Sequence, residues 1–269
     1  MRFYLRGNVM ALFRIDHTSE CVKVSLPLYM IMPSPYHLKD KPLESYKVLY
    51  LLHGLSDDAS AWQRYTNIEI LARERDLVVV MPDGGRSMYA DMQNGQAYFT
   101  YLTEELPAYL KAVFHLNLER ENTLIAGLSM GGYGAFKAGF LRPDLYSVAG
   151  SFSGALALSF EGEFVDEERL KEFSLVFGDL SKFPGSSNDP LTWPDIAAKD
   201  PERYPALYAA CGLQDFLIEA NRAFVHKARA AGISLAYVEE PGIHDWHFWN
   251  SQIAAFLDLY VKPANQTQA

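Results

Sequence analysis

Residues Thr123–Gly131 read TLIAGLSMG, an apolar run of strand length that leads into a G-x-S-x-G motif. Gly127, Ser129 and Gly131 make up this motif, and a glycine-rich stretch with helical spacing follows it. A serine between a strand and a helix sits on a tight turn, where small residues two places before and after it relieve crowding. We therefore predict that Ser129 presents its hydroxyl at the turn, with the Met130 N–H beside it at a positive helix N-terminus.

A glycine-rich turn without chemistry is the alternative interpretation of this stretch. A phosphate-binding loop is favoured still less, because neither G-x-G-x-x-G nor G-x-x-x-x-G-K-[ST] can be read through these residues. If Ser129 reacts, it needs a base, since a serine hydroxyl is a poor nucleophile at its free pKa. In proteins with this kind of turn, an acid and then a histidine follow the serine along the chain.

The chain has seven histidines that compete to be this base. Five of them precede the serine or lie on a predicted helix face: His17, His37, His53, His115 and His226. His244 and His247 remain, in the stretch PGIHDWHFW. We predict that His244 ends the loop before the last helix and is the base, with helix capping as its alternative role. We expect His247 one turn inside that helix, packed among aromatic side chains.

The acid is expected on the loop after the apolar run Ala206–Ala210, where the chain reads CGLQDFL. Asp215 in this loop could hold the imidazole in its productive tautomer. Capping of the next helix is the alternative role for this aspartate. Three other acids compete: Asp195, Asp200 and Asp245. The first two fall in an irregular segment, and the third is too close in sequence to His244 to reach its ring easily.

Acyl transfer also requires two donors aimed at the developing oxyanion. The Met130 N–H would supply one of them. We assign the second to the Leu55 N–H, in the loop after the apolar run Tyr46–Leu52, because Gly54 lets the backbone approach a substrate. An ordinary turn would also use a glycine there.

Aromatic residues are dense near these loops: Trp62, Tyr89, Trp193, Trp246 and Trp249. Core packing explains most tryptophans. We predict that Trp62, Trp193 and Trp246 bind substrate, and we favour the first two because they sit in loop-like contexts. The pair His244 and His247 has zinc-ligand spacing, but no third ligand is evident nearby, so we expect no metal site.

Short apolar runs alternate with helical segments after the first quarter of the chain, which reads as strands. The predicted strands are Met10–Ile15, Val22–Met32, Tyr46–Leu52, Leu77–Met81, Thr123–Ala126, Val148–Phe152, Ala206–Ala210 and Leu235–Val238. The predicted helices are Tyr98–Phe114, Ala135–Leu141, Leu217–Ala231 and Trp246–Val261. This pattern indicates an α/β fold with a mostly parallel sheet covered on both faces. We expect a single domain over residues 1–262, an irregular insertion at 155–205 over the carboxyl ends of the strands, and a flexible tail at 263–269.

The amino-acid composition argues against some classes of binding partner. The chain has 269 residues, is 49% hydrophobic and carries a formal net charge of −9, which argues against nucleic acid as a partner. No apolar window approaches the roughly 18 residues of a membrane helix, and the N-terminus has no signal-peptide core. We expect a cytoplasmic protein with no membrane association, whose Cys21 and Cys211 are reduced thiols.

Several further motifs agree with the serine motif: HGL-x-DD-x3-W, GLSMGGYGAF, FSGAL, CG-x-QDFL-x-EAN and HDW-x-FW. With them, the sequence resembles the tributyrin esterases of the esterase D / putative esterase family from about Tyr46 to Trp249. The resemblance implies an α/β-hydrolase fold and hydrolysis of short-chain acyl esters, acetyl to butyryl. It makes Ser129, Asp215 and His244 the matching triad. Relatives often also cleave acetyl esters on sugars and aryl esters.

The wider family includes S-formylglutathione hydrolases, feruloyl esterases and mycolyl transferases. S-formylglutathione hydrolases usually carry histidine before the nucleophile and a tyrosine-rich stretch after the catalytic histidine, whereas this chain has Leu128 and the HDW-x-FW pattern. Feruloyl esterase activity stays open. The alternative from another functional class is a non-catalytic binding module with the same fold. Such a module would normally have lost a triad residue, whereas Ser129, Asp215 and His244 are all present here. We expect a cofactor-free hydrolase of small-molecule esters, with the oligomeric state, including a homo-oligomer, left open.

Overall fold

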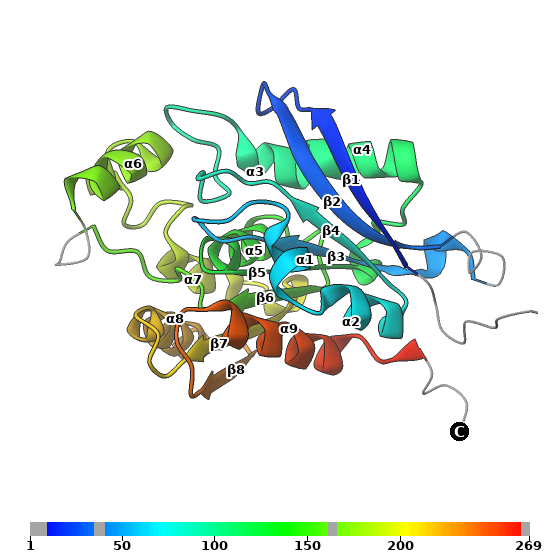
Figure 1. Ribbon diagram of the computed structural model, residues 1–269. Coiled ribbons are helices and arrows are strands. Elements are labelled where there is room, and N and C mark those ends of the chain that lie inside the picture. Colours follow the sequence, from blue (N-terminus) through cyan, green and yellow to red (C-terminus); the bar gives the residue numbers. More distant parts are fainter. Residues whose placement is uncertain (1–9, 35–40, 161–165, 265–269) are drawn as a thin grey trace, which may run out of the picture.

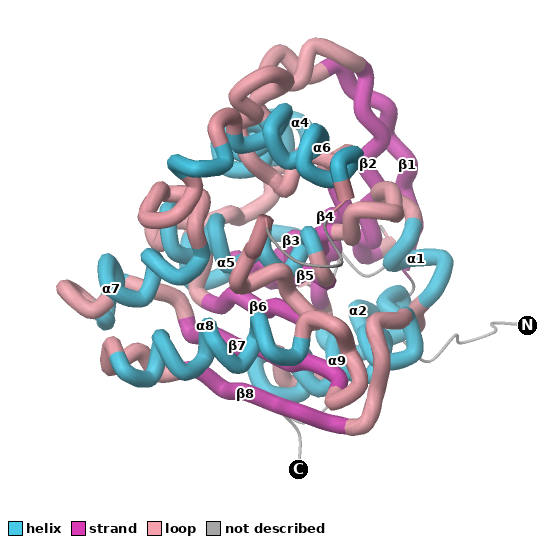
Figure 2. The backbone as a smooth tube through the Cα atoms, turned by 90° about the vertical axis from the view of Figure 1, so that its left-hand side faces the viewer, coloured by secondary structure: helices cyan, strands magenta, loops and turns pink. Residues whose placement is uncertain are grey.

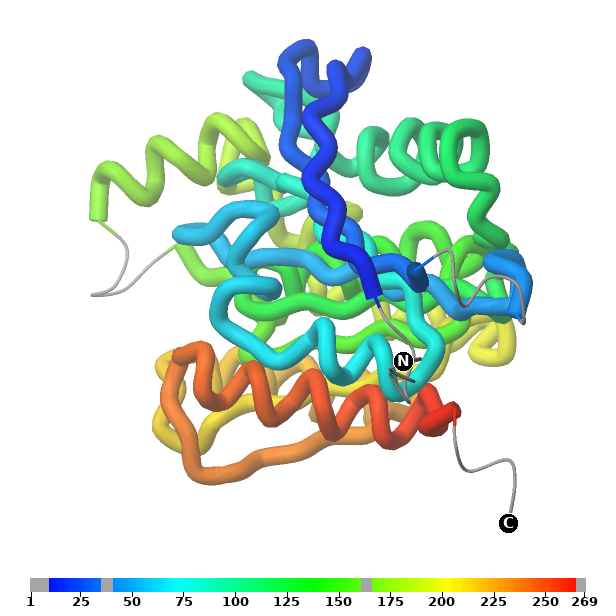
Figure 3. The backbone as a smooth tube through the Cα atoms, turned by 45° about the vertical axis from the view of Figure 1, so that its right-hand side comes forward, coloured from blue at the N-terminus to red at the C-terminus, as the bar shows by residue number. Residues whose placement is uncertain are grey.

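The computed structural model describes residues 10–34, 41–160 and 166–264. These residues form an eight-stranded sheet in the order β1-β2-β4-β3-β5-β6-β7-β8. The strands are β1 Met10–Thr18, β2 Ser25–Pro33, β3 Lys47–Leu52, β4 Leu77–Pro82, β5 Thr123–Leu128, β6 Val148–Phe152, β7 Ala206–Gly212 and β8 Leu235–Glu240. Strands β3 to β8 are parallel, whereas β2 pairs antiparallel with both β1 and β4. The β1–β2 hairpin and β8 lie at opposite edges of the molecule (Figure 3).

Helices cover both faces of the sheet (Figures 1 and 2). They are α1 Ala61–Tyr65, α2 Ile68–Arg75, α3 Tyr98–Thr100, α4 Leu106–Phe114, α5 Met130–Leu141, α6 Glu167–Phe177, α7 Trp193–Ala197, α8 Ile218–Ala230 and α9 Trp246–Tyr260. Side chains of α1, α2 and α9 pack in one core layer. Side chains of α4, α5, α7 and α8 pack in the other.

Strand β4 shows why the chain forms a sheet buried on both faces. Its residues Val78 and Val80 point into one core layer, and Leu77, Val79 and Met81 point into the other. Successive side chains of a strand alternate between the two faces, so a strand covered on both sides must be apolar at every position. The predicted α/β architecture with a mostly parallel sheet is confirmed.

Some predicted elements have different limits. The expected strand Val22–Met32 begins only at Ser25, because Ser19 and Lys23 form a turn in which the Lys23 N–H donates to the Ser19 carbonyl at 2.9 Å. The expected helix Tyr98–Phe114 contains a π-helical turn, Tyr101–Glu105, between α3 and α4. Four helices of the described residues were not predicted: α1, α2, α6 and α7.

The predicted insertion contains the helices α6 and α7 and several single 3-10 turns. Its two parts lie in different places. Helix α7 packs against α5 and α8 in a core layer, whereas Arg169 of α6 lines a cavity beside Ser129. Only part of the insertion therefore reaches the site. Residues 265–269 of the expected flexible tail lie outside the described residues.

Within the described residues, no helix is both long and apolar enough to cross a membrane. The same part of the chain contains no cluster of three or more His, Cys, Asp or Glu side chains suited to a metal ion. Cys21 and Cys211 are free thiols, the second of them buried.

Candidate active site

Ser129 stands alone between the end of β5 and the start of α5. Its φ of 51° and ψ of −115° lie outside the regions that L-residues usually adopt, which marks a strained turn. Both glycines of the motif are needed for close packing. A Cβ at Gly127 would lie 2.5 Å from the Gly131 backbone, and one at Gly131 would lie 2.4 Å from the Leu52 carbonyl oxygen. The predicted strand-to-helix turn is thus present with its predicted crowding.

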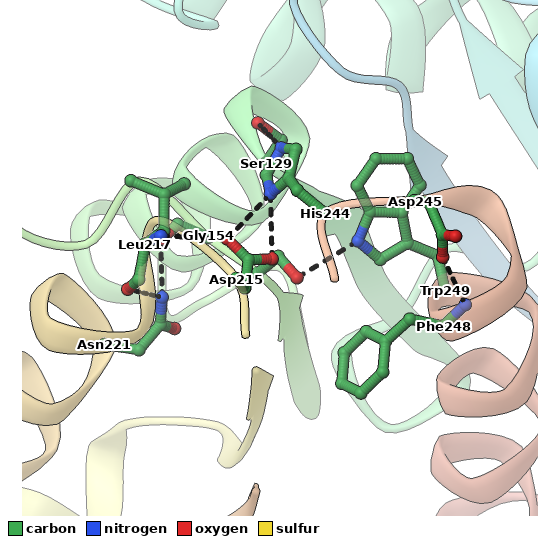
Figure 4. A network of polar contacts seen from close by, with 10 residues as sticks. Ser129, Gly154, Asp215, Leu217, Asn221, His244, Asp245, Phe248 and Trp249 are labelled. Carbon is green, nitrogen blue, oxygen red and sulfur yellow. Dashed lines mark hydrogen bonds and ion pairs between the residues drawn. The ribbon is translucent and has the colours of Figure 1, made fainter. Parts of the chain in front are cut away.

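Ser129, His244 and Asp215 form a continuous chain of polar contacts (Figure 4). The His244 Nε2 is 3.0 Å from the Ser129 Oγ. The His244 Nδ1 is 2.9 Å from Asp215 Oδ2 and 3.1 Å from Oδ1. An ionised carboxylate only accepts hydrogen bonds, so Nδ1 must donate, and Nε2 then has a lone pair for the serine proton. The arrangement can deprotonate the Ser129 hydroxyl.

Asp215 is a buried carboxylate whose side chain is 0% exposed. Burial alone would raise its pKa, but hydrogen bonds from His244, the Leu217 N–H and the Ser153 side chain outweigh burial and hold the pKa below its usual value. Asp215 Oδ1 accepts the Leu217 N–H at 2.8 Å just before α8 begins. This hydrogen bond fixes the loop, but α8 has no side-chain cap, so of the two roles considered for Asp215 the structure supports the partner of the imidazole and not the helix cap.

The structure corrects the expectation for His247. This residue lies in the first turn of α9 and its side chain is exposed, not packed among aromatic residues one turn inside the helix. The helix begins at Trp246 because Asp245 caps it, accepting the Phe248 N–H at 3.0 Å. That hydrogen bond also gives Asp245 a structural role, away from the imidazole of His244.

The loop after β3 lies directly against the serine turn. A Cβ at Gly54 would lie 2.7 Å from the Leu128 Cδ1, so a side chain at this position would have to displace Leu128. The preceding residue, His53, is buried and holds the loop in place. Its Nε2 accepts the Gly84 N–H at 2.9 Å, which leaves Nδ1 to donate to the Gly54 carbonyl at 2.8 Å. This structural role of His53 was not predicted, because the residue precedes the serine in the chain, although its position next to Gly54 was a usable signal.

A cavity of about 470 Å³ opens beside these groups. Its lining residues are Gly54, Leu55, Ser56, Asp57, Leu128, Ser129, Arg169, Phe216, His244, Asp245, Trp246 and Trp249. Leu55, the predicted oxyanion donor, and Trp246, a predicted substrate-binding residue, both line this cavity. Phe216, which packs on the His244 ring with the centroids 4.5 Å apart, was not predicted, although it directly follows Asp215.

Trp62 and Trp193 do not line this cavity. Trp62 is 1% exposed and donates its indole N–H to the Leu52 carbonyl at 2.9 Å. Trp193 is 0% exposed, donates to the Ser187 carbonyl at 2.9 Å and packs on Phe140. The expectation that these two tryptophans contact substrate is therefore corrected: both belong to the core. Loop-like sequence around a tryptophan says little about which way its ring points.

The chain is similar to known esterases and serine hydrolases. The family model described as putative esterase matches residues 19–259. An acetyl esterase of Caldicellulosiruptor saccharolyticus is 31% identical over 94% of this chain and 99% of its own length.

Two solved structures from Staphylococcus aureus have nearly the same backbone. The fluorophosphonate-binding serine hydrolase FphF aligns with a TM-score of 0.85 and 30% identity, over 94% of this chain and 99% of its own. The S-formylglutathione hydrolase FrmB aligns with a TM-score of 0.82 and 30% identity, over 94% of this chain and 100% of its own. With a family model matched over most of its length, the chain belongs to the putative esterase family, and it is a serine ester hydrolase with the α/β-hydrolase fold.

Proposed function

We propose that this enzyme is a carboxylesterase that hydrolyses short-chain acyl esters, acetyl to butyryl, through an acyl-enzyme on Ser129. The observation that carries the proposal is the Ser129–His244–Asp215 contact chain at the wall of the cavity. The similarity to an acetyl esterase over 94% of the chain supports the choice of ester.

In the first half of the reaction, the His244 Nε2 takes the Ser129 proton as the Oγ attacks the ester carbonyl. Negative charge develops on the carbonyl oxygen, and the N–H groups of Leu55 and Met130 stabilise it. Asp215 stabilises the imidazolium that forms. The tetrahedral intermediate then collapses, the ester C–O bond breaks, and His244 gives its proton to the departing alcohol.

In the second half, water replaces the alcohol. The His244 Nε2 takes a proton from the water as its oxygen attacks the acyl-enzyme carbonyl. The second tetrahedral intermediate releases the carboxylic acid, and the proton returns to the Ser129 Oγ. Atoms balance over the cycle as ester plus water giving acid plus alcohol, with no cofactor required.

The preference for short acyl chains rests on the aromatic wall of the cavity. Trp246 is in edge contact with both Trp62 and Trp249, with centroids 5.2 Å apart in each pair. Trp62 is a buried core residue, so Trp246 is backed by a side chain that cannot move aside easily. An acyl chain that extends toward this wall runs out of space after a few carbons.

Mutation of the serine tests the proposal most directly. Ser129→Ala should reduce kcat for p-nitrophenyl acetate by several orders of magnitude, leave the circular dichroism spectrum unchanged and abolish labelling by a fluorophosphonate probe. If the variant kept more than a few per cent of the wild-type rate, Ser129 would not be the nucleophile.

A thioesterase of the S-formylglutathione hydrolase type is the second candidate. It is favoured by the 30% identity to the Staphylococcus aureus enzyme over 94% of this chain. Leu128 before the nucleophile and the HDW-x-FW pattern argue against it. Measuring kcat/KM for S-formylglutathione beside p-nitrophenyl acetate distinguishes the two candidates, because a dedicated thioesterase should prefer the thioester by orders of magnitude.

A further inference from the structure

Ser153 follows β6 directly and is completely buried beneath the site. Its φ is +48°, a conformation that is costly for a residue with a side chain. Its N–H donates to the Ala210 carbonyl at 2.7 Å, which ties the end of β6 to β7. Strand β7 leads into the loop that carries Asp215. A strained, buried polar residue thus stands next to the acid.

The Ser153 hydroxyl accepts a hydrogen bond from the indole N–H of Trp249, at 3.1 Å. An indole N–H only donates, so the Ser153 Oγ must be the acceptor in this contact. The hydroxyl proton of Ser153 is then available for a different partner.

Two groups next to Ser153 could accept that proton: the carboxylate of Asp215 and the sulfur of Cys211. Burial raises the pKa of the Cys211 thiol to about 12, so it is neutral near pH 7. A charged acceptor forms the stronger hydrogen bond. The hydroxyl proton of Ser153 is therefore assigned to Asp215, whose pKa is held down in part by a hydrogen bond from the Ser153 side chain.

Trp249 also contacts the base. Its ring lies perpendicular to the His244 imidazole, at an interplanar angle of 89° and a centroid distance of 4.9 Å. Figure 4 shows Asp215 and Trp249 beside His244, and Trp249 comes from α9, which starts directly after the histidine loop. One indole thus packs on the base and, through Ser153, is linked to the acid.

We infer that Ser153 and Trp249 are positioning residues: they hold the Asp215 carboxylate and the His244 imidazole in the relative orientation that their hydrogen bond requires. Neither acts on the substrate in this role. Ser153 donates to the carboxylate, and Trp249 fixes the direction of that donation because its N–H occupies the other side of the hydroxyl oxygen. The inference rests on the proposed function, since it assigns a purpose to the same three catalytic groups.

Ser153→Gly is the sharpest test. It removes the hydroxyl, and glycine adopts a positive φ without strain, so the fold is retained. Ser151→Ala is the matched control: Ser151 lies in β6, two residues before Ser153, and is equally buried, and within the described residues its Oγ has no hydrogen-bond partner. Trp249→Phe is a second variant that keeps an aromatic ring and removes the N–H.

For Ser153→Gly we expect kcat for p-nitrophenyl acetate to fall about 10- to 100-fold, the value of one charge-assisted hydrogen bond, with KM unchanged. The acidic limb of the kcat/KM profile should move to higher pH, because the less neutralised Asp215 charge holds a proton on the imidazole more tightly. Trp249→Phe should move it in the same direction. The other ionisable groups of the cavity wall, Asp57, Arg169 and Asp245, are the same in every variant.

Ser151→Ala should match the wild type in kcat and in pH profile. A Ser153→Gly enzyme with wild-type kcat, or with a lower kcat but an unmoved acidic limb, would overturn the positioning role. Ser129→Ala is measured in the same series. If that variant stayed active, the proposed function itself would fail, whereas an inactive Ser129→Ala beside an unaffected Ser153→Gly would refute only the positioning inference.

Discussion

Gly131 and Leu52 bring the serine turn and the neighbouring loop together: a Cβ on Gly131 would lie 2.4 Å from the Leu52 carbonyl oxygen. The first turn of α5 therefore rests on the end of β3, from which the loop of Gly54 and Leu55 begins. This contact sets how close the proposed nucleophile lies to the second proposed oxyanion donor. It is made between backbone groups, so no change of side-chain rotamer can relieve a clash there.

Gly131→Ala should consequently lower both stability and activity. The added methyl must displace backbone, and we expect a loss of about 2–3 kcal/mol in the free energy of unfolding, measured by urea denaturation. Gly185→Ala is the control, because Gly185 has a φ of +83° and nothing within 4 Å of a Cβ. It should cost only about 1 kcal/mol, for its backbone conformation, and leave kcat unchanged. Equal losses in the two variants would contradict the crowding argument.

The two histidines near α9 should differ sharply on mutation. His244→Ala should be nearly as damaging to kcat as Ser129→Ala, because the two residues act as a unit. His247→Ala should keep wild-type activity and stability, since its side chain is exposed in the first turn of the helix. Steady-state kinetics and thermal melting of both variants check this. A strong loss of activity in His247→Ala alone would mean that the histidines have exchanged roles.

The acyl-chain preference should depend on Trp246. In the wild type we expect p-nitrophenyl acetate and butyrate to be hydrolysed far faster than octanoate. Trp246→Ala should raise kcat/KM for longer esters by up to about fourfold per additional buried methylene, equivalent to about 0.8 kcal/mol each. Trp193→Phe is the control: Trp193 is a core residue, so its replacement should lower stability and leave the chain-length profile unchanged. A wild-type rate that peaked at ten or more carbons would contradict the short-chain proposal.

Lys137 gives a pH-dependent prediction for stability. It is 3% exposed, and burial lowers its pKa from 10.5 to about 7, against an opposing effect of Asp91. Between these two pH values the unfolded chain binds more protons than the folded one, so this lysine makes the free energy of unfolding rise with pH from about 7 toward 10. Below about pH 7 the amine of Lys137 is charged in the folded protein, and burial of this charge lowers the free energy of unfolding.

Lys137→Met should therefore be more stable than the wild type at pH 6, by about 1–2 kcal/mol, with a smaller difference at pH 9.5. Urea denaturation at the two pH values measures this. Lys111→Met is the control, because Lys111 is exposed on α4 and its replacement should produce no pH-dependent difference. A Lys137→Met protein that was less stable than the wild type at pH 6 would show that the charged amine, 4.8 Å above the Phe99 ring, is a net stabilising group.

Much of the fold followed from local pattern. The run LVVVM at Leu77–Met81 had to be a strand buried on both faces, and it is. Helix α2 was missed although Ile68, Leu71 and Ala72 recur at helical spacing and are buried. Helix α6 was missed because four prolines later in the same segment, between Pro184 and Pro201, suggested an irregular structure for all of it. In both cases a short amphipathic signal was outweighed by polar neighbours, and tertiary packing decided the outcome.

The amino-acid sequence by itself predicted the strand-to-helix turn at Ser129, because the apolar run and the G-x-S-x-G motif that follows it are neighbours in the chain. The contact that requires glycine at position 131 is tertiary, since it is made with Leu52 of β3. It also proposed His244 and Asp215, because the order of the loops along the chain limits which residues can meet. Only the tertiary structure decided which aromatic rings line the cavity. Trp193 and Trp246 cannot be distinguished by composition, yet one is fully buried and the other lies beside the serine. Side-chain direction depends on how whole helices pack, and no short stretch of sequence contains that information.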